Sequence, residues 1–224
     1  MSRGNKLKRP ASAYRRGKPR FEPAGSTFLV VTEGKKTEPN YYKALRQNLR
    51  LSSADVEIVH PPATDPVSLT EEAIKLRNAR NSDARKGDGV VYDEVWVIFD
   101  LETTHDERRK LAAEAARIAK KESVNFAFSD PAFEYWLLLH FEYTTSAFED
   151  CDAVINRLSL HWPGYAKGTV PVANLFKFLP DAIKRAQRCR MHHKTGGGDG
   201  KPSTNNDVLV ERLNAATRPH LRLF

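Results

Sequence analysis

Two apolar runs that each end in an acidic residue constrain the fold of this chain most strongly. Residues 27–32 run directly into Glu33, and residues 94–99 run directly into Asp100. Short, continuously apolar runs are typical of buried strands in a parallel sheet. Open α/β sheets bind their ligands at the edge where the carboxyl ends of such strands lie. The sequence therefore predicts that these two acids are collected at one edge of a sheet.

Strand-like and helix-like segments alternate along the first two thirds of the chain. Strands are expected at 27–32, 56–60, 94–99 and 124–128. Helices are expected to begin at Thr37, at Asp65-Pro66 (ending near Arg80), at Asp106 and at Ala132 (ending near Tyr143), with a loop at 81–89. Strands that alternate with helices predict an α/β fold: a mainly parallel, Rossmann-like sheet with helices on both faces.

The last third has a different composition, and it predicts a C-terminal helical appendage. Helices are expected at 150–160, 180–193 and 208–216, with a loop at 195–206. The predicted organisation is a basic flexible arm (1–25), an α/β domain (26–145) and a helical C-terminal region (146–224) that packs on the sheet domain.

The net charge of +8 is concentrated in the N-terminal arm. Residues 1–20 contain eight Lys and Arg residues and no acid, and the Lys and Arg residues of the rest of the chain equal the 28 Asp and Glu residues in number. Basic arms gain affinity for phosphate backbones by counterion release. Arg15, Arg16, Lys18 and Arg20 are therefore candidate nucleic-acid contacts. The alternative is a solvated tail.

The composition excludes a membrane-spanning class. No stretch approaches the roughly 20 uninterrupted apolar residues that a spanning helix needs, and the basic N-terminus lacks the apolar segment of a signal peptide. The two cysteines, Cys151 and Cys189, lack the spacing of a zinc site and fit reduced thiols. We therefore expect a cytoplasmic protein.

Glu33, Asp100 and Glu102 form the primary candidate site. In an extended stretch Asp100 and Glu102 point the same way, because side chains alternate with period two. Carboxylates from two strand ends suit a hard divalent cation, Mg²⁺ or Mn²⁺, which prefers oxygen ligands and supports phosphodiester chemistry. The alternative is three ordinary surface acids at loop starts.

Four neighbouring residues are candidates for supporting roles. Glu134 lies in an apolar run where an ionised carboxylate is costly to bury unless it is paired or metal-bound; it either extends the metal site, pairs with an arginine or faces water. His140 is either a proton carrier or a hydrogen-bonded structural histidine. Lys35 and Lys36 either contact phosphate or are solvated charges.

Two further patterns lie in the last third. The Lys and Arg residues between 180 and 194 predict a second cationic surface, for nucleic acid, a partner protein or solvent alone. The glycine-rich segment 196–201 fails the phosphate-binding loop pattern, because Thr195 stands where that pattern needs glycine and Pro202 where it needs Ser or Thr. ATP binding by this loop is therefore rejected.

Four motifs resemble the RloB-like family and occur in its order. They are VVTEGKKTEPNYY at 30–42, YDEVWVIFD at 92–100, SDPAFEYWLLLHF at 129–141 and PSTN at 202–205. The resemblance covers about residues 27–213, so it includes nearly everything except the arm. Together the four motifs are specific, although the Glu-Gly pair alone is weak.

The resemblance implies a TOPRIM-type fold, the metal-binding module of topoisomerases, primases and OLD-type nucleases. Glu33 then matches the acid after the first strand of the module, and Asp100 matches the first acid of its Asp-x-Asp pair. Glu102 stands at the second acid and departs from the pattern by one methylene. The resemblance also implies a role in bacterial defence against phage, often beside an ATPase partner.

Two functional hypotheses follow. The first is a Mg²⁺-dependent TOPRIM-type nuclease that hydrolyses DNA or RNA, with Glu33, Asp100, Glu102 and Glu134 as catalytic residues. The second is a non-catalytic nucleic-acid-binding or sensor subunit that works with an ATPase. A third possibility is a toxin that is active only when it is released from its partner. The choice between DNA and RNA, the number of metal ions and the oligomeric state stay open at this point.

Overall fold

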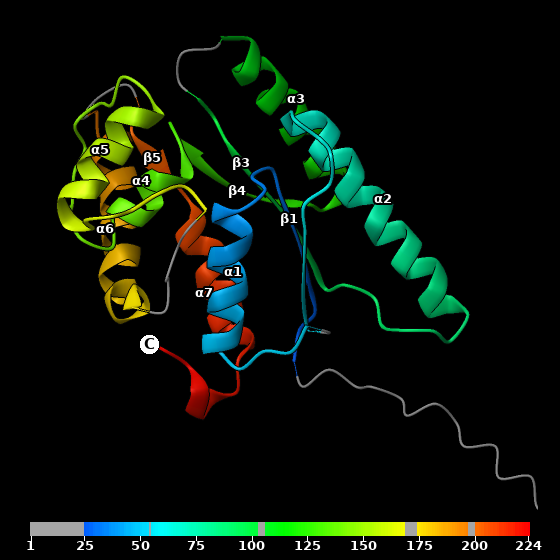
Figure 1. The fold of residues 1–224 in the computed structure, drawn as a ribbon. Coiled ribbons are helices and arrows are strands. Elements are labelled where there is room, and N and C mark those ends of the chain that lie inside the picture. The colour runs from blue at the N-terminus through cyan, green and yellow to red at the C-terminus, as the bar shows by residue number, and fades with distance from the viewer. Residues whose placement is uncertain (1–24, 54, 103–105, 169–173, 197–199) are drawn as a thin grey trace, which may run out of the picture.

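A single mixed sheet forms the centre of the protein. The computed structural model describes residues 25–53, 55–102, 106–168, 174–196 and 200–224. Its strands are β1 (Phe28–Thr32), β2 (Val56–Val59), β3 (Glu94–Asp100), β4 (Asn125–Asp130) and β5 (Ser203–Thr204). They are arranged in the order β2-β1-β3-β4-β5, and every pair is parallel except β4 with β5 (Figure 1). The expected α/β class with a mainly parallel sheet is confirmed.

Helices cover both faces of this sheet. The α-helices are α1 (Thr37–Asn48), α2 (Pro66–Arg85), α3 (Asp106–Glu122), α4 (Phe133–Leu138), α5 (Cys151–His161), α6 (Leu179–Lys194) and α7 (Asn206–Ala216). The described residues also include the 3₁₀ turns η2 (Phe176–Phe178) and η3 (Pro219–Leu221). Figure 1 shows α2 and α3 on one side of the sheet and the other α-helices on the opposite side. The described residues contain no helix that is both long and apolar enough to cross a membrane.

The alternation of side chains along the strands creates two separate apolar cores. Leu29 and Val31 of β1 pack with Leu69 of α2 and with other residues of that face. Phe28 and Val30, the alternate residues of the same strand, pack in the larger core with α1 and the C-terminal helices. Because β1 is buried on both faces, its continuously apolar sequence is required by its position in the sheet.

The register of the strands brings the expected acids to one edge. Thr32, the last residue of β1, is level with Ile98 of β3, and Asp100 is level with Ser129 of β4. The backbone N–H of Glu33 still donates to the carbonyl of Ile98 at 3.0 Å. Glu33 and Asp100 therefore leave neighbouring strands at nearly the same height.

Helix boundaries differ from the sequence expectations at two places. α2 continues through Arg85, so most of the loop expected at 81–89 is helical. The polar residues after Arg80 contain no helix breaker before Gly87, whose φ is +83°. α4 is shorter than expected and ends at Leu138. Both of its sides are buried, so its largely apolar sequence carries no periodicity that marks an end.

The C-terminal region supplies part of the sheet as well as helices. β5 lies within the loop expected at 195–206 and pairs with β4. The side chain of Asn205 donates to the carbonyl of Phe126 at 2.9 Å and accepts from the N–H of Phe128 at 2.7 Å. Asn205 therefore continues the hydrogen bonding of the sheet beyond the two residues of β5. The domain boundaries proposed above stay a prediction.

Candidate functional site

A cavity of about 430 Å³ lies at the carboxyl ends of β1 and β3. The connection after β1 passes through α1 on one face, and the connection before β3 passes through α2 on the other face. This is the point where the strand order reverses, which is where open α/β sheets place ligands. The cavity is lined by five acids, Glu33, Glu38, Asp100, Glu102 and Glu134, and by three lysines, Lys35, Lys36 and Lys167.

The turn between β1 and α1 places a buried acid in the cavity. A Cβ on Gly34 would lie only 1.9 Å from a carboxylate oxygen of Glu38, so the glycine of the Glu-Gly pair makes room for this side chain. Glu38 is only 6% exposed and lies in the first turn of α1, where its own backbone N–H donates to it. Burial, with repulsion from Glu134 and Glu33, raises the pKa of Glu38 to about 7.

Asp100 is a second acid of the cavity whose pKa is raised. Burial raises its pKa well above the usual 3.8, and repulsion from Glu38, Glu134 and Glu33 raises it further. The backbone N–H of Phe133, at the start of α4, donates to Asp100 and partly opposes this shift. Burial and the neighbouring acids therefore both disfavour a negative charge on Asp100.

Glu134 faces the same cavity from α4 and is 2% exposed. Its carboxylate accepts a hydrogen bond from the Tyr165 hydroxyl at 2.8 Å, and the Cys151 thiol lies 3.8 Å away. Lys167 approaches from the same loop as Tyr165. Burial lowers the pKa of Lys167, but its interactions with Glu134, Cys151 and Asp100 together raise that pKa above the usual value. Glu134 is therefore held by a hydrogen bond from Tyr165 and by electrostatic attraction to Lys167. It belongs to the acidic cluster around Asp100.

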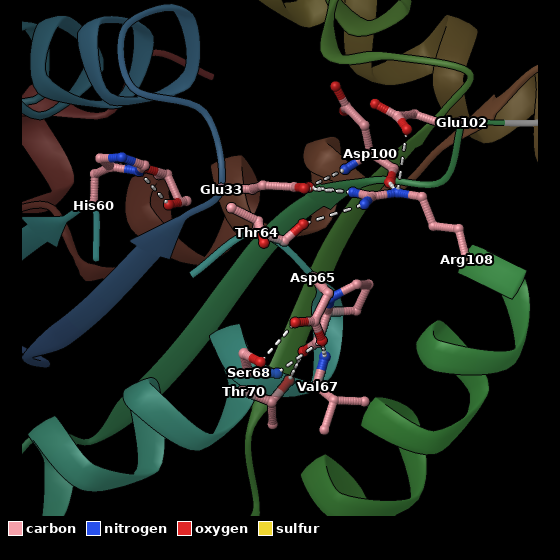
Figure 2. Close-up of polar contacts among 12 residues, drawn as sticks. Glu33, His60, Thr64, Asp65, Val67, Ser68, Thr70, Asp100, Glu102 and Arg108 are labelled. Atoms are coloured by element: carbon pink, nitrogen blue, oxygen red, sulfur yellow. Dashed lines mark hydrogen bonds and ion pairs between the residues drawn. The ribbon is translucent and has the colours of Figure 1, made fainter. Parts of the chain in front are cut away.

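Glu33 has a different partner. Arg108, from the first turn of α3, donates through Nη2 to Oε1 of Glu33 at 2.6 Å and also contacts Oε2. Its Nε donates to the backbone carbonyl of Asp100 at 2.7 Å (Figure 2). The backbone N–H of Asp100 in turn donates to Oε2 of Glu33 at 3.2 Å. Glu33 is therefore an ion-paired acid that joins the end of β1 to the end of β3.

Glu102 lies at the rim of the cavity. Its side chain is 53% exposed, and one carboxylate oxygen is 3.7 Å from Nε of Arg108. Its backbone has a φ of 45°, a left-handed conformation that is uncommon outside glycine, and its N–H donates to the carbonyl of Pro131 at 3.1 Å. Glu102 therefore shares Arg108 with Glu33, and its backbone departs from that of a straight strand.

The expected trio meets in one cavity but not around one point. In the described parts of the chain, no group of three or more His, Cys, Asp or Glu residues has a geometry that could hold a metal ion. Glu33 and Glu102 face Arg108, whereas Asp100 is grouped with Glu38 and Glu134. Metal binding by Glu33, Asp100 and Glu102 stays a prediction.

The lysines and the histidine considered from the sequence have separate positions. Lys35 and Lys36 are exposed at the mouth of the cavity. His140 is 1% exposed and forms hydrogen bonds with the Tyr41 hydroxyl and with the carbonyl of Trp136. Burial lowers the pKa of His140 to about 4. His140 is thus a neutral structural histidine at physiological pH. The arm residues Arg15, Arg16, Lys18 and Arg20 lie outside the described residues.

The second cationic surface expected at 180–194 is only partly available to a ligand. Arg185 donates to the carbonyls of Leu139 and His140, and Arg190 pairs with the buried Asp207. Lys184 and Arg188 line a separate shallow groove on α6, where Arg188 stacks on Tyr143 at 4.0 Å. Two of the arginines therefore stabilise the fold.

Three residues in or beside the cavity are not identified by the sequence patterns: Glu38 and Lys167, which line it, and Arg108, which contacts Glu33. Glu38 precedes Pro39 in the first turn of a helix, where an acid is common for reasons of the helix dipole alone. Arg108 is one of many charges on α3, and Lys167 lies in an irregular segment after α5. Only their tertiary contacts identify these three residues as parts of the site.

Comparisons with known proteins give one finding. Neither the curated proteins nor the solved structures that were compared include a match to this chain. A family model described as RloB-like protein matches residues 28–213, which span β1 to α7 and so all of the sheet and the whole cavity. The chain belongs to the RloB-like protein family.

Proposed function

We propose that this protein is a nuclease that hydrolyses phosphodiester bonds of DNA or RNA and depends on Mg²⁺ or Mn²⁺. The observation that carries the proposal is the acidic cavity at the switch point of the sheet, where burial and mutual repulsion raise the pKa values of Asp100 and Glu38. Such a cluster is costly to ionise unless a cation compensates it.

The donor set of the cavity fits a hard divalent cation, because every candidate ligand is a carboxylate. We assign Asp100, Glu33 and Glu102 as the proposed ligands, with Glu38 and Glu134 as further acids around Asp100. A bound cation would supply positive charge that polarises a phosphoryl oxygen. The cavity therefore fits a divalent cation by the type of its ligands. Among the described residues, these side chains do not converge on one point.

The lysines of the cavity have a separate role in the proposal. Lys35 and Lys36 are exposed at its mouth and would attract a phosphate backbone. Lys167 faces Glu134 and would attract that carboxylate and fix its position. The arm residues Arg15, Arg16, Lys18 and Arg20 would add affinity that is independent of sequence and sensitive to salt.

The biological setting of the proposal is defence against phage in the bacterial cytoplasm, with an ATPase as a partner. Membership of the RloB-like family supports this setting by resemblance alone. A TOPRIM-type module remains the proposed description of the sheet, and the strand order around the cavity is compatible with it.

A cleavage assay tests the proposal. The protein is incubated with labelled single- and double-stranded DNA and RNA, with Mg²⁺, Mn²⁺ or EDTA. We expect cleavage that needs the metal and that Asp100→Asn and Glu33→Gln abolish, because each removes a proposed ligand charge. Glu107→Gln is the matched control, since Glu107 is an exposed acid of α3 outside the cavity lining. Cleavage that survives both ligand substitutions would refute the assignment.

One observation favours the second candidate function, a nucleic-acid-binding or sensor subunit. Arg108 already compensates Glu33, so the structure shows a stable cavity in which one proposed ligand is ion-paired. In this case we expect binding that is sensitive to salt, that is weakened by deletion of residues 1–20 and that is not followed by cleavage. Assays with and without an ATPase partner separate this function from a nuclease that is active only when released.

A further inference from the structure

Arg108 is held by acceptors from three segments of the chain: the end of β1, the end of β3 and the connection before α2. Besides Glu33 and the carbonyl of Asp100, its Nη1 lies 3.5 Å from the carbonyl of Thr64, just before α2 (Figure 2). Its side chain is only 12% exposed. A guanidinium with this many fixed acceptors is a defined part of the site, in contrast to the exposed arginines elsewhere on α3.

The contacts of Arg108 occupy both oxygens of Glu33. Nη2 of Arg108 contacts Oε1 and Oε2, and the N–H of Asp100 adds a second donor on Oε2. A divalent cation that used Glu33 as a ligand would therefore meet a guanidinium at the same carboxylate. Two positive groups a few Å apart repel strongly where water is scarce.

Arg108 does not compensate the other acids of the cavity. Its contact with Asp100 is to the backbone carbonyl, and the groups that shift the pKa of the Asp100 carboxyl are Glu38, Glu134, Glu33 and Phe133. Arg108 thus compensates Glu33, whereas Lys167 is the lysine that interacts with the three acids Asp100, Glu38 and Glu134. The two groups of acids in the cavity therefore have different cationic partners.

We propose that Arg108 and a divalent cation compete for the carboxylate of Glu33, so that Arg108 sets the metal affinity of the cavity. This inference rests on the proposed function, because it assumes that Glu33 is a metal ligand. Since the coupling of two binding events is reciprocal, removal of Arg108 strengthens the binding of the cation. Arg108 is then a residue that controls loading of the site, and the cation must displace it.

Calorimetric titration with MnCl₂ measures the effect without any substrate. We expect Arg108→Gln to bind Mn²⁺ about ten-fold more tightly than the unchanged protein, within the range typical of coupled sites. Arg108→Lys keeps the charge but loses the fork that spans Glu33 and Asp100, so an intermediate affinity is expected. Circular dichroism confirms that each variant is folded.

Two controls separate competition at Glu33 from a general loss of positive charge. Arg117→Gln removes a 75% exposed arginine from the same helix, where its partner is Glu114, and should leave Mn²⁺ affinity unchanged within about two-fold. In a Glu33→Gln background, the further change Arg108→Gln should no longer strengthen Mn²⁺ binding. Strengthening that persists without Glu33 overturns the proposal.

The remaining outcomes distinguish this inference from the proposed function. If Arg108→Gln weakens Mn²⁺ binding or leaves it unchanged while Asp100→Asn weakens it, the cavity binds metal but Arg108 is no competitor, and only the inference fails. If neither the unchanged protein nor Arg108→Gln binds Mn²⁺, the metal-dependent function fails and the inference fails with it.

Discussion

At the scale of single residues, Glu38 shows how a buried side chain beside the Glu33-Gly34 pair can affect the whole site. It is buried against Gly34, and its pKa of about 7 places its titration close to neutral pH. A carboxyl group with a raised pKa opposes folding when it is ionised. Near neutral pH this residue therefore couples the stability of the fold to the charge of the cavity.

We predict that Glu38→Gln stabilises the protein at pH 8 but not at pH 4. The folded protein binds the Glu38 proton more tightly than the unfolded chain, so stability falls as pH rises from the ordinary pKa of 4.5 to about 7. The amide, which has the same shape and no charge, removes that loss. Thermal or urea unfolding at both pH values should show a gain of about 1–3 kcal/mol at pH 8 alone.

A divalent cation provides the control for this prediction. Mn²⁺ at pH 8 should stabilise the unchanged protein by binding the folded state, and it should stabilise Glu38→Gln less. Equal pH dependence in the two proteins would show that Glu38 does not titrate as its surroundings require.

The sequence identifies only those site residues that its local patterns mark. Glu33 and Asp100 follow apolar strands, so the sheet edge at which they meet can be predicted from the chain alone. Glu38, Arg108 and Lys167 reach the cavity through contacts between elements, and no spacing in the sequence encodes them. Glu102 was predictable as a neighbour of Asp100, but the left-handed turn that moves it to the rim was not.

At the scale of elements, the four long strands follow from the sequence and the fifth does not. Continuous apolar runs mark β1 and β3, and an alternating pattern marks β2, whereas the two residues of β5 are too few for any periodicity. β5 is held by its partners: Ser203 and Thr204 pair with β4, and Asn206 follows at the start of α7. The hydrogen bonds of Asn206 to Ser129 of β4 and to Thr204 of β5 explain why this short strand is fixed next to β4.

Asn206 should be essential for attaching α7 to the sheet. It is fully buried, accepts a hydrogen bond from the Tyr42 hydroxyl at 2.6 Å and donates to Oγ of Ser129 at 2.9 Å. We predict that Asn206→Ala lowers the free energy of unfolding by about 2–4 kcal/mol, because it leaves buried polar partners unsatisfied. Denaturant unfolding measures the loss.

Tyr42→Phe gives the matched comparison. It removes only one hydroxyl and should cost about 1–2 kcal/mol. In the double variant the two losses should not add, because both substitutions break the same hydrogen bond. Full additivity would mean that the contact between α1 and α7 contributes nothing to stability.

At the scale of the whole molecule, the C-terminal third is part of the same body as the sheet. The larger core contains residues from β1 through α7. Polar contacts also cross the expected boundary near residue 145: Tyr165 donates to Glu134, and Tyr135 donates to Cys189 at 3.0 Å. The cavity itself includes Lys167 and Gly168 from the C-terminal region. The site therefore depends on both parts of the chain.

We predict that residues 26–145 and 146–224 unfold together in one transition. The two segments share one hydrophobic core and one sheet, so the unfolding of either segment disrupts both structures. Trp162→Phe removes the tryptophan of the C-terminal third, so its fluorescence reports on Trp96 and Trp136 within 26–145, while far-ultraviolet circular dichroism reports on helices of both parts. In urea the two signals should share a midpoint. Helical signal that is lost at lower urea than the fluorescence change would instead mean that the C-terminal region is an independent appendage, and that the cavity loses Lys167 before the sheet unfolds.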